Sequence, residues 1–149
     1  MASLLIVAHA PLASSLMAVA RHVYPDCGSV MAPIDVDASG GLIAAVELVR
    51  AGLLALPGPE CLILTDVFGA TPCNAAVEAA AGSRIRIVAG VNVPMLWRTL
   101  CYVDLPLNEL VQRALTGAAS GVMHVGVPRR QNQNILSGRD AQHPNPHQQ

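Results

Sequence analysis

One strand–turn–helix unit within residues 60–78 constrains the fold of this chain more than any other stretch. Residues 61–65 form a short continuous apolar run, which is the pattern of a strand covered on both faces. The Ala-rich residues 72–81 predict a helix, with Thr71 as its N-cap and Pro72 in the first helical position. The turn between them begins with Asp66, so a carboxylate should lie close to the free N–H groups of a helix N-terminus. Such a turn can hold a phosphate group, although capped helices after strands are also an ordinary feature of α/β proteins.

Similar units recur along the chain and predict an α/β fold. Strands are expected at residues 4–8, 30–36, 61–65, 85–89 and 122–127, and helices at residues 12–24, 40–56, 72–81, 94–101 and 107–116. Ser39 is the candidate cap of the second of these helices. Alternating strands and helices imply a mostly parallel sheet with right-handed crossovers and helices on both faces. If the strand order is 2-1-3-4, ligands should bind between the carboxyl ends of the first and third strands.

The composition fits one α/β domain and argues against several other classes of protein. With 149 residues, 52% of them hydrophobic and 3% aromatic, the chain can bury an aliphatic core between Ala-rich helices. A net charge of -1, without a basic cluster in the body of the chain, argues against a nucleic-acid surface. The four cysteines have neither metal-ligand nor disulfide-scaffold spacing.

The two ends of the sequence predict its location and its domain boundary. The N-terminus has no basic leader and no apolar run of membrane-spanning length, so we expect a cytoplasmic protein. Residues 1–128 should form the domain. Residues 129–149 are polar and rich in Gln, Asn and Pro, which is the composition of a disordered tail or a truncated linker.

Polar residues at the expected strand ends suggest a chemistry. The first strand ends in His9, the third is followed by Asp66, and the fourth by Gly90 and Asn92. A lone His after a strand is more often structural than catalytic, but an adjacent carboxylate changes its role. Asp66 could accept the N–H of Nδ1, which would leave the Nε2 lone pair free as a nucleophile. His9 and Asp66 are therefore predicted to face each other across the crevice.

The turn after Asp66 could receive a phosphoryl group that His9 attacks. Backbone N–H groups between Gly69 and Cys73 and the Thr71 hydroxyl would meet the phosphoryl oxygens. The sequence has no GxxxxGK[ST] loop for ATP, no G-x-S-x-G elbow and no cluster of acids for Mg²⁺. We therefore expect no metal and no cofactor, and a donor that brings its own activated phosphoryl group.

Three blocks of sequence carry a resemblance to a known family. They are LLIVAHAPLASSL around His9, LILTDVFGATPCNAA around Asp66, and VAGVNVPMLWRTL around Asn92. The chain resembles the enzyme IIA component of the mannose-type (mannose/fructose/sorbose) phosphoenolpyruvate-dependent sugar phosphotransferase system. The first block is similar to that family's first strand and phosphorylated His. The second is similar to its Asp-x-x-Gly-Gly-Ser-Pro-x-Asn block, and the third to its Ala-Gly-Val-Asn-x-Pro-Met-Leu block.

The resemblance implies a flavodoxin-like sheet and a homodimer that exchanges the short C-terminal edge strand. It implies a phosphohistidine intermediate at His9, a histidine-containing phosphocarrier protein as donor, and a IIB protein as acceptor. Because the chain ends in a short polar tail, we expect that acceptor on a separate chain. The expected site residues group around the pair of His9 and Asp66: for phosphate binding, Gly69, Ala70, Thr71, Cys73 and Asn74; for the pocket wall, Phe68, Pro72, Asn92, Pro94 and Met95.

Two departures from the family's pattern bear on loop mobility and docking. Ala70 replaces the second Gly of the second block, Thr71 replaces its Ser, and Arg98 stands where the family commonly has an acid.

Other functions stay open at this point. The same pocket would serve a regulatory module whose partners read the phosphorylation state without sugar transport. The phosphotransfer subunit of a dihydroxyacetone kinase and a flavin- or nucleotide-binding protein fit the motifs less well.

Overall fold

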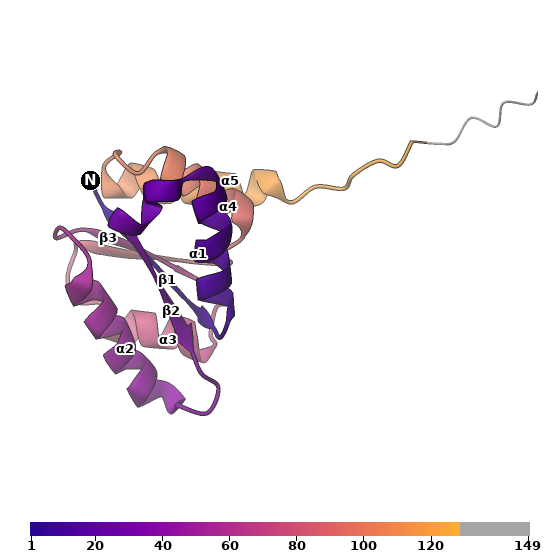
Figure 1. Cartoon of the computed structure of the whole chain (residues 1–149). Coiled ribbons are helices and arrows are strands. Elements are labelled where there is room, and N and C mark those ends of the chain that lie inside the picture. Colours follow the sequence, from indigo (N-terminus) through magenta and orange to yellow (C-terminus); the bar gives the residue numbers. More distant parts are fainter. Residues whose placement is uncertain (129–149) are drawn as a thin grey trace, which may run out of the picture.

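A computed structural model describes residues 1–128 and shows one parallel sheet between two layers of helices (Figure 1). The elements follow in the order β1 (Ser3–His9), α1 (Leu12–Val23), the 3-10 helix η1 (Pro25–Ser29), β2 (Met31–Val36), α2 (Gly41–Ala55), β3 (Cys61–Thr65), α3 (Thr71–Ala79), β4 (Ile85–Ala89), α4 (Val93–Cys101) and α5 (Leu107–Gly121). All strand pairs are parallel, in the order β2-β1-β3-β4. The predicted fold class and strand order are confirmed.

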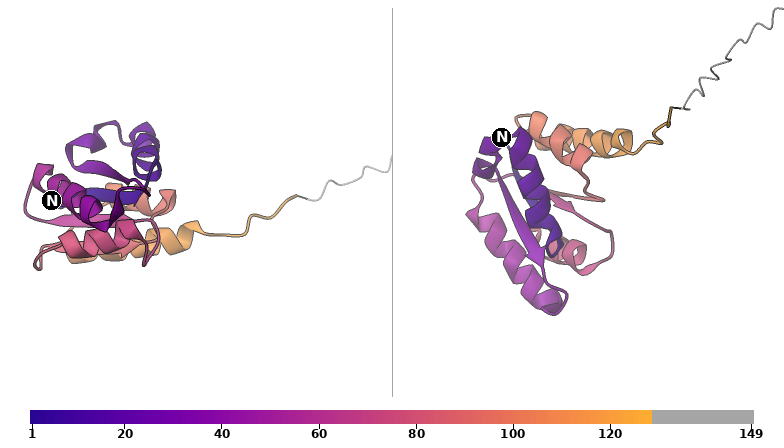
Figure 2. Two further views of the ribbon diagram at one scale, coloured as in Figure 1. Left: turned by 90° about the horizontal axis from the view of Figure 1, so that it is seen from below. Right: turned by 45° about the vertical axis from the view of Figure 1, so that its right-hand side comes forward.

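Each face of the sheet has its own core, because successive strand residues point to opposite sides. Leu4 and Ile6 of β1 pack with α1, α4 and α5, whereas Leu5 and Val7 pack with α2 and α3. Figure 2 shows α4 and α5 lying side by side, and these two helices are in contact along their length. Strands β1 and β3, in the middle of the sheet, are buried on both faces, as their continuous apolar runs predict.

Two predicted helix caps are wrong. Helix α3 begins at Thr71, its N-cap is Ala70, and no side chain bonds to the helix start. Pro72 therefore occupies the second helical position, where its missing N–H also leaves no intrahelical bond unmade. The N-cap of α2 is Gly40, without a side-chain bond, because the Ser39 hydroxyl donates to Asp37 at 2.7 Å.

The C-terminal part of the described chain differs from its prediction. Helix α5 continues to Gly121, beyond the expected end at residue 116, and residues 122–128 form no strand within this part of the single chain. A strand needs a partner for its backbone groups, and residues 122–128 lead away from the body (Figure 2).

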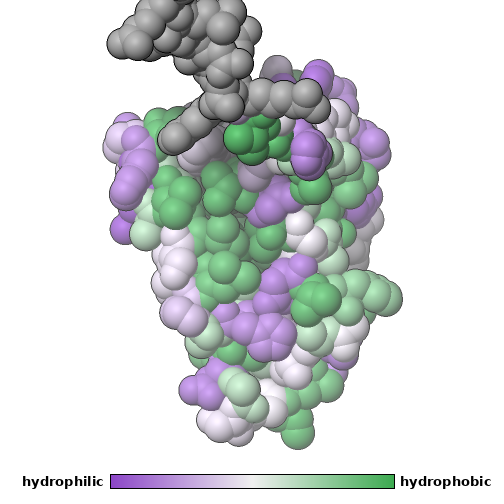
Figure 3. All heavy atoms as spheres, turned by 90° about the vertical axis from the view of Figure 1, so that its right-hand side faces the viewer, coloured by the Kyte–Doolittle hydropathy of each residue, from purple (hydrophilic) through white to green (hydrophobic). Residues whose placement is uncertain are grey.

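The segment 122–128 leaves its apolar side chains open to solvent: Val122, Met123, Val125 and Val127 are 70–87% exposed. Figure 3 shows further hydrophobic residues, in green, in a band down this face of the molecule. The expected exchange of this segment in a dimer stays a prediction. The expected tail, residues 129–149, lies outside the described residues.

Candidate functional site

The site lies at the carboxyl ends of β1 and β3, where strand pairing brings two distant residues together. Val7 of β1 is in register with Thr65 of β3, so His9 and Asp66 extend past this pair at the same edge of the sheet. His9 Nδ1 lies 2.6 Å from Oδ2 of Asp66, and the His9 backbone N–H donates to the same oxygen at 2.9 Å. The other oxygen, Oδ1, accepts the backbone N–H of Val67 at 2.8 Å. The predicted contact between the imidazole and the carboxylate is present in the structure.

This hydrogen bonding fixes which nitrogen of His9 is free. An ionised carboxylate only accepts hydrogen bonds, so a neutral imidazole facing it carries its proton on Nδ1 and leaves a lone pair on Nε2. The His9 side chain is 47% exposed and the Asp66 side chain 12% exposed. The ring is therefore open to a partner while the group that orients it is largely enclosed.

Asp66 is held in its charged form. Partial burial raises the pKa of its carboxyl group, but the hydrogen bonds from the His9 N–H, the His9 ring and the Val67 N–H outweigh this effect and lower the pKa below its ordinary value. A carboxylate that is ionised at neutral pH can stabilise positive charge on an adjacent imidazole.

The backbone around Asp66 also ties the β4–α4 loop to the site. The N–H of Gly90 donates to the carbonyl oxygen of Asp66 at 2.8 Å, and the N–H of Val91 donates to that of Thr65 at 2.9 Å. Asn92 then caps α4, because its side-chain oxygen accepts the N–H of Met95 at 2.8 Å. The loop that carries Asn92 is thus fixed against the strand end that carries Asp66.

The turn from Asp66 leads directly into the uncapped N-terminus of α3. Gly69 has a φ of 85°, which an L side chain rarely adopts, and its carbonyl accepts the side-chain N–H of Asn74 at 3.1 Å. The helix begins immediately afterwards, and the N–H of Asn74 donates to Ala70. The N–H groups of Thr71 and Cys73 in the first turn have no intrahelical partner by the geometry of an α-helix. They are free hydrogen-bond donors at the positive end of the helix dipole, in the turn that follows Asp66.

The residues expected as a pocket wall lie in three different environments. Phe68 is 85% exposed and so belongs to an open rim. Pro72 is buried in α3, and the side chain of Cys73 is also buried, so only the backbone of Cys73 can meet a ligand. Met95 is 1% exposed and packs in the core between the sheet and α4, which contradicts its expected place in the wall. The inward face of α4 explains this position, because Met95, Leu96, Thr99 and Leu100 repeat at helical spacing and are all buried.

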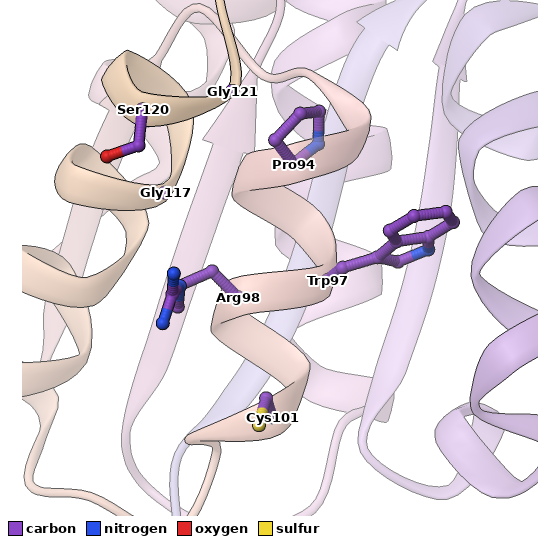
Figure 4. A pocket seen from close by; sticks show the side chains of 7 residues that line it. All are labelled: Pro94, Trp97, Arg98, Cys101, Gly117, Ser120 and Gly121. Atoms are coloured by element: carbon purple, nitrogen blue, oxygen red, sulfur yellow. The ribbon is translucent and has the colours of Figure 1, made fainter.

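A cavity of about 340 Å³ between α4 and α5 lies outside this constellation (Figure 4). Of the expected site residues only Pro94 lines it. Trp97 and Arg98 point away from α4 in opposite directions, so their side chains do not converge on a shared ligand. Gly117 of α5 packs close to α4 here, since an added Cβ would lie 2.6 Å from Cβ of Arg98. The cavity is therefore not part of the predicted site.

One pair of residues near the site was not predicted as a contact. Asp35, at the end of β2, accepts hydrogen bonds from both the backbone N–H and the hydroxyl of Ser14 in α1. The sequence signal was only an acid at the end of an expected strand. Among residues 1–128 no group of three or more His, Cys, Asp or Glu side chains could hold a metal ion, and no helix there is apolar and long enough to cross a bilayer.

Comparisons with known proteins agree on the family. Residues 3–115 match the family described as PTS system fructose IIA component. No curated protein matches the sequence. The mannose/sorbose specific IIA subunit of the phosphotransferase system from Enterococcus faecalis has a similar structure, with a TM-score of 0.77 and 24% identity over 85% of this chain and 96% of that chain.

Two further solved structures have the same fold. The phosphotransferase system component EIIA from Streptococcus agalactiae gives a TM-score of 0.73 at 21% identity, covering 83% of this chain and 97% of that chain. The PTS IIA protein associated with the fucose utilization operon from Streptococcus pneumoniae gives 0.62 at 23% identity, covering 78% and 93%. The family match spans most of the chain, including both β1 and the turn after β3. The chain therefore belongs to the fructose- and mannose-type IIA components of the sugar phosphotransferase system, a family whose role is phosphotransfer.

Proposed function

We propose that this protein is a phosphocarrier in which Nε2 of His9 accepts a phosphoryl group and passes it on. The observation that carries the proposal is the 2.6 Å contact between Nδ1 of His9 and Oδ2 of Asp66. It holds the ring in the tautomer whose free lone pair is on the exposed nitrogen. Family membership supports the same chemistry at the same strand end.

The transfer needs no metal to balance its charges. The Nε2 lone pair attacks phosphorus and forms a new P–N bond, while the bond from phosphorus to the donor's nitrogen breaks and that electron pair stays on the donor. The proton on Nδ1 remains between the ring and Asp66, whose negative charge stabilises the transient imidazolium. In this proposal the backbone N–H groups of Thr71 and Cys73 and the Thr71 hydroxyl donate to the phosphoryl oxygens.

The donor and the acceptor are proposed from the family. A histidine-containing phosphocarrier protein would supply the phosphoryl group, and a IIB protein would accept it for sugar uptake. The exposed ring of His9 and the exposed Phe68, two residues after Asp66, fit a reaction between two protein surfaces better than the binding of an enclosed small molecule. We also propose that two copies of the chain pair through residues 122–127, because this apolar segment is otherwise exposed.

The direct test is phosphorylation with phosphoenolpyruvate, enzyme I and the phosphocarrier protein, followed by intact-mass measurement under neutral conditions. The wild-type chain should gain one acid-labile phosphoryl group. His9→Ala should gain none, whereas the control His22→Ala, which removes an exposed imidazole from α1, should behave like the wild type. Phosphorylation of His9→Ala at the wild-type rate would refute the proposal.

A regulatory role is the second candidate. The solved structure titled sigma-54 interaction domain protein from Enterococcus faecalis shares the fold, with a TM-score of 0.66 at 15% identity. In that case phosphorylated and free His9 would bind different partners, and no sugar would be moved. Transfer of the phosphoryl group from the isolated phosphoprotein to a IIB protein would favour the transport role, and failure of every IIB protein would favour the regulatory one.

A further inference from the structure

Helix α1 begins without the capping groups that a helix start normally has. Its N-cap is Pro11, no side chain within the helix start bonds to the free N–H groups, and the first turn contains no acidic residue. The connection from His9 to this helix is short, because β1 ends at His9 and α1 begins at Leu12. The order of the helix start therefore bears directly on the order of His9.

The missing cap is supplied from a neighbouring strand. Oδ1 of Asp35 accepts the backbone N–H of Ser14 at 3.1 Å, and Oδ2 accepts the Ser14 hydroxyl. Asp35 is in register with Ala8 on β1, so its carboxylate stands beside the end of the strand that carries His9. A carboxylate at the third residue of a helix also opposes the positive end of the helix dipole.

We infer that Asp35 is a positioning residue for His9, acting through the first turn of α1. The segment from His9 to Ser14 is held at both ends by carboxylates: Asp66 of β3 accepts the His9 N–H, and Asp35 of β2 accepts the Ser14 N–H. Between them, the N–H of Ala10 donates to the carbonyl of Val36 at 3.0 Å. With both ends tied, the imidazole keeps its Nδ1 on Asp66. If the contact between Asp35 and Ser14 is removed, the segment can move and the imidazole can turn away from Asp66.

This inference rests on the proposed phosphoryl transfer for its functional consequence, so the test has an arm that needs no transfer. Long-range proton–nitrogen NMR spectra of the imidazole rings report which nitrogen of His9 is protonated, with His9→Ala used to assign the signal. Asp35→Ala should shift His9 away from the Nδ1–H tautomer. Asp35→Asn should restore it, because the amide can still accept the Ser14 N–H and donate to the Ser14 hydroxyl oxygen. Asp104→Ala, which removes an exposed carboxylate between α4 and α5, is the matched control.

The second arm measures transfer kinetics with the phosphocarrier protein. Asp35→Ala should lower kcat about tenfold or more with KM for the donor unchanged, because a misplaced nucleophile affects the reacting geometry and not the docking surface. The kcat of Asp35→Asn should be close to that of the wild type. The inference would be overturned if the nitrogen chemical shifts of His9 in Asp35→Ala were the same as in the wild type. It would also be overturned if Asp35→Ala and Asp104→Ala lowered the transfer rate equally. If Asp35→Ala fails to fold, Ser14→Ala removes only the hydroxyl contact and must produce a smaller change of the same kind. A tautomer shift without phosphorylation of the wild type would refute the proposed function and leave the positioning role standing.

Discussion

Asp66→Asn is the change that separates the chemistry of the site from its fold. Asp66 accepts three hydrogen bonds, two from His9 on Oδ2 and one from Val67 on Oδ1. An amide has only one acceptor oxygen. If that oxygen faces His9, the amide N–H₂ faces the Val67 N–H, and a donor loses its partner. If it faces Val67, the N–H₂ faces His9 and favours the tautomer whose Nε2 carries the proton and cannot attack.

The size of the effect follows from these contacts. A hydrogen bond to a charged group contributes about 1.5–3 kcal/mol, and at least one such bond to the developing imidazolium is lost or replaced by a neutral one. Loss of that amount in the transition state slows transfer roughly 10- to 150-fold. The free energy of unfolding should fall by a similar amount, because the Asp66 side chain is only 12% exposed and water can replace little of what is lost.

Single-turnover transfer from the phosphorylated donor, followed by rapid quench, measures the rate, and urea unfolding at neutral pH measures the stability. Asp104→Asn is the control, since it makes the same chemical change at an exposed residue. A folded Asp66→Asn protein that accepts phosphate at the wild-type rate would refute the role assigned to the carboxylate. An equal loss of transfer rate in Asp66→Asn and in Asp104→Asn would also refute this role.

Four further outcomes are expected. Because the folded-state pKa of Asp66 is lowered, the difference in unfolding free energy between wild type and Asp66→Asn should be complete above about pH 4 and shrink as the pH falls further; a constant difference down to acid pH, measured by urea unfolding, would contradict this. The Cβ of Gly69→Ala would meet no neighbour, but alanine rarely adopts the positive φ of this position, so the free energy of unfolding should fall by about 1–2 kcal/mol in the same assay. Gly69→Asn should lower it less, because Asn adopts a positive φ more readily. Light scattering should give a dimer mass for the full chain and a lower mass after deletion of residues 122–149, and a monomeric full chain would exclude pairing through this segment. Deletion of residues 129–149 alone should change neither the melting temperature nor phosphate uptake, because that sequence has only Ile135 and Leu136 as neighbouring apolar residues.

The strands were readable from the sequence because each is marked at both ends. The apolar run of β3 and the mostly apolar β4 begin after charged residues and end before a turn, and the predicted bounds agree with the structure. His9 and Asp66 followed from the same pattern, since parallel strands place their carboxyl ends at one edge. What could be predicted was therefore the part of the site that depends on strand ends and strand order.

The parts that could not be predicted depend on contacts between distant elements. Ser39 looked like a helix cap, but its hydroxyl bonds to Asp37 in its own loop, and a local competitor of this kind is not visible in a residue pattern. The capping of α1 joins Ser14 and Asp35, which meet only after β1 and β2 pair. The segment 122–127 is short and mostly apolar, as expected of a strand, yet whether such a segment forms one is decided by the presence of a partner strand.

The burial of β1 has a consequence for how long partners stay together. Leu4 to Ala8 have no exposed surface, and His9 follows directly at the end of this strand, with Asp66 at the end of the equally buried β3. His9 and Asp66 are thus attached to buried strands in the middle of the sheet, which we expect to hold them in place before any partner arrives. Little conformational entropy remains to be lost on association, so an encounter can be productive without a large interface. Brief, weak complexes with rapid dissociation would suit the proposed carrier role, in which one partner supplies the phosphoryl group and another accepts it.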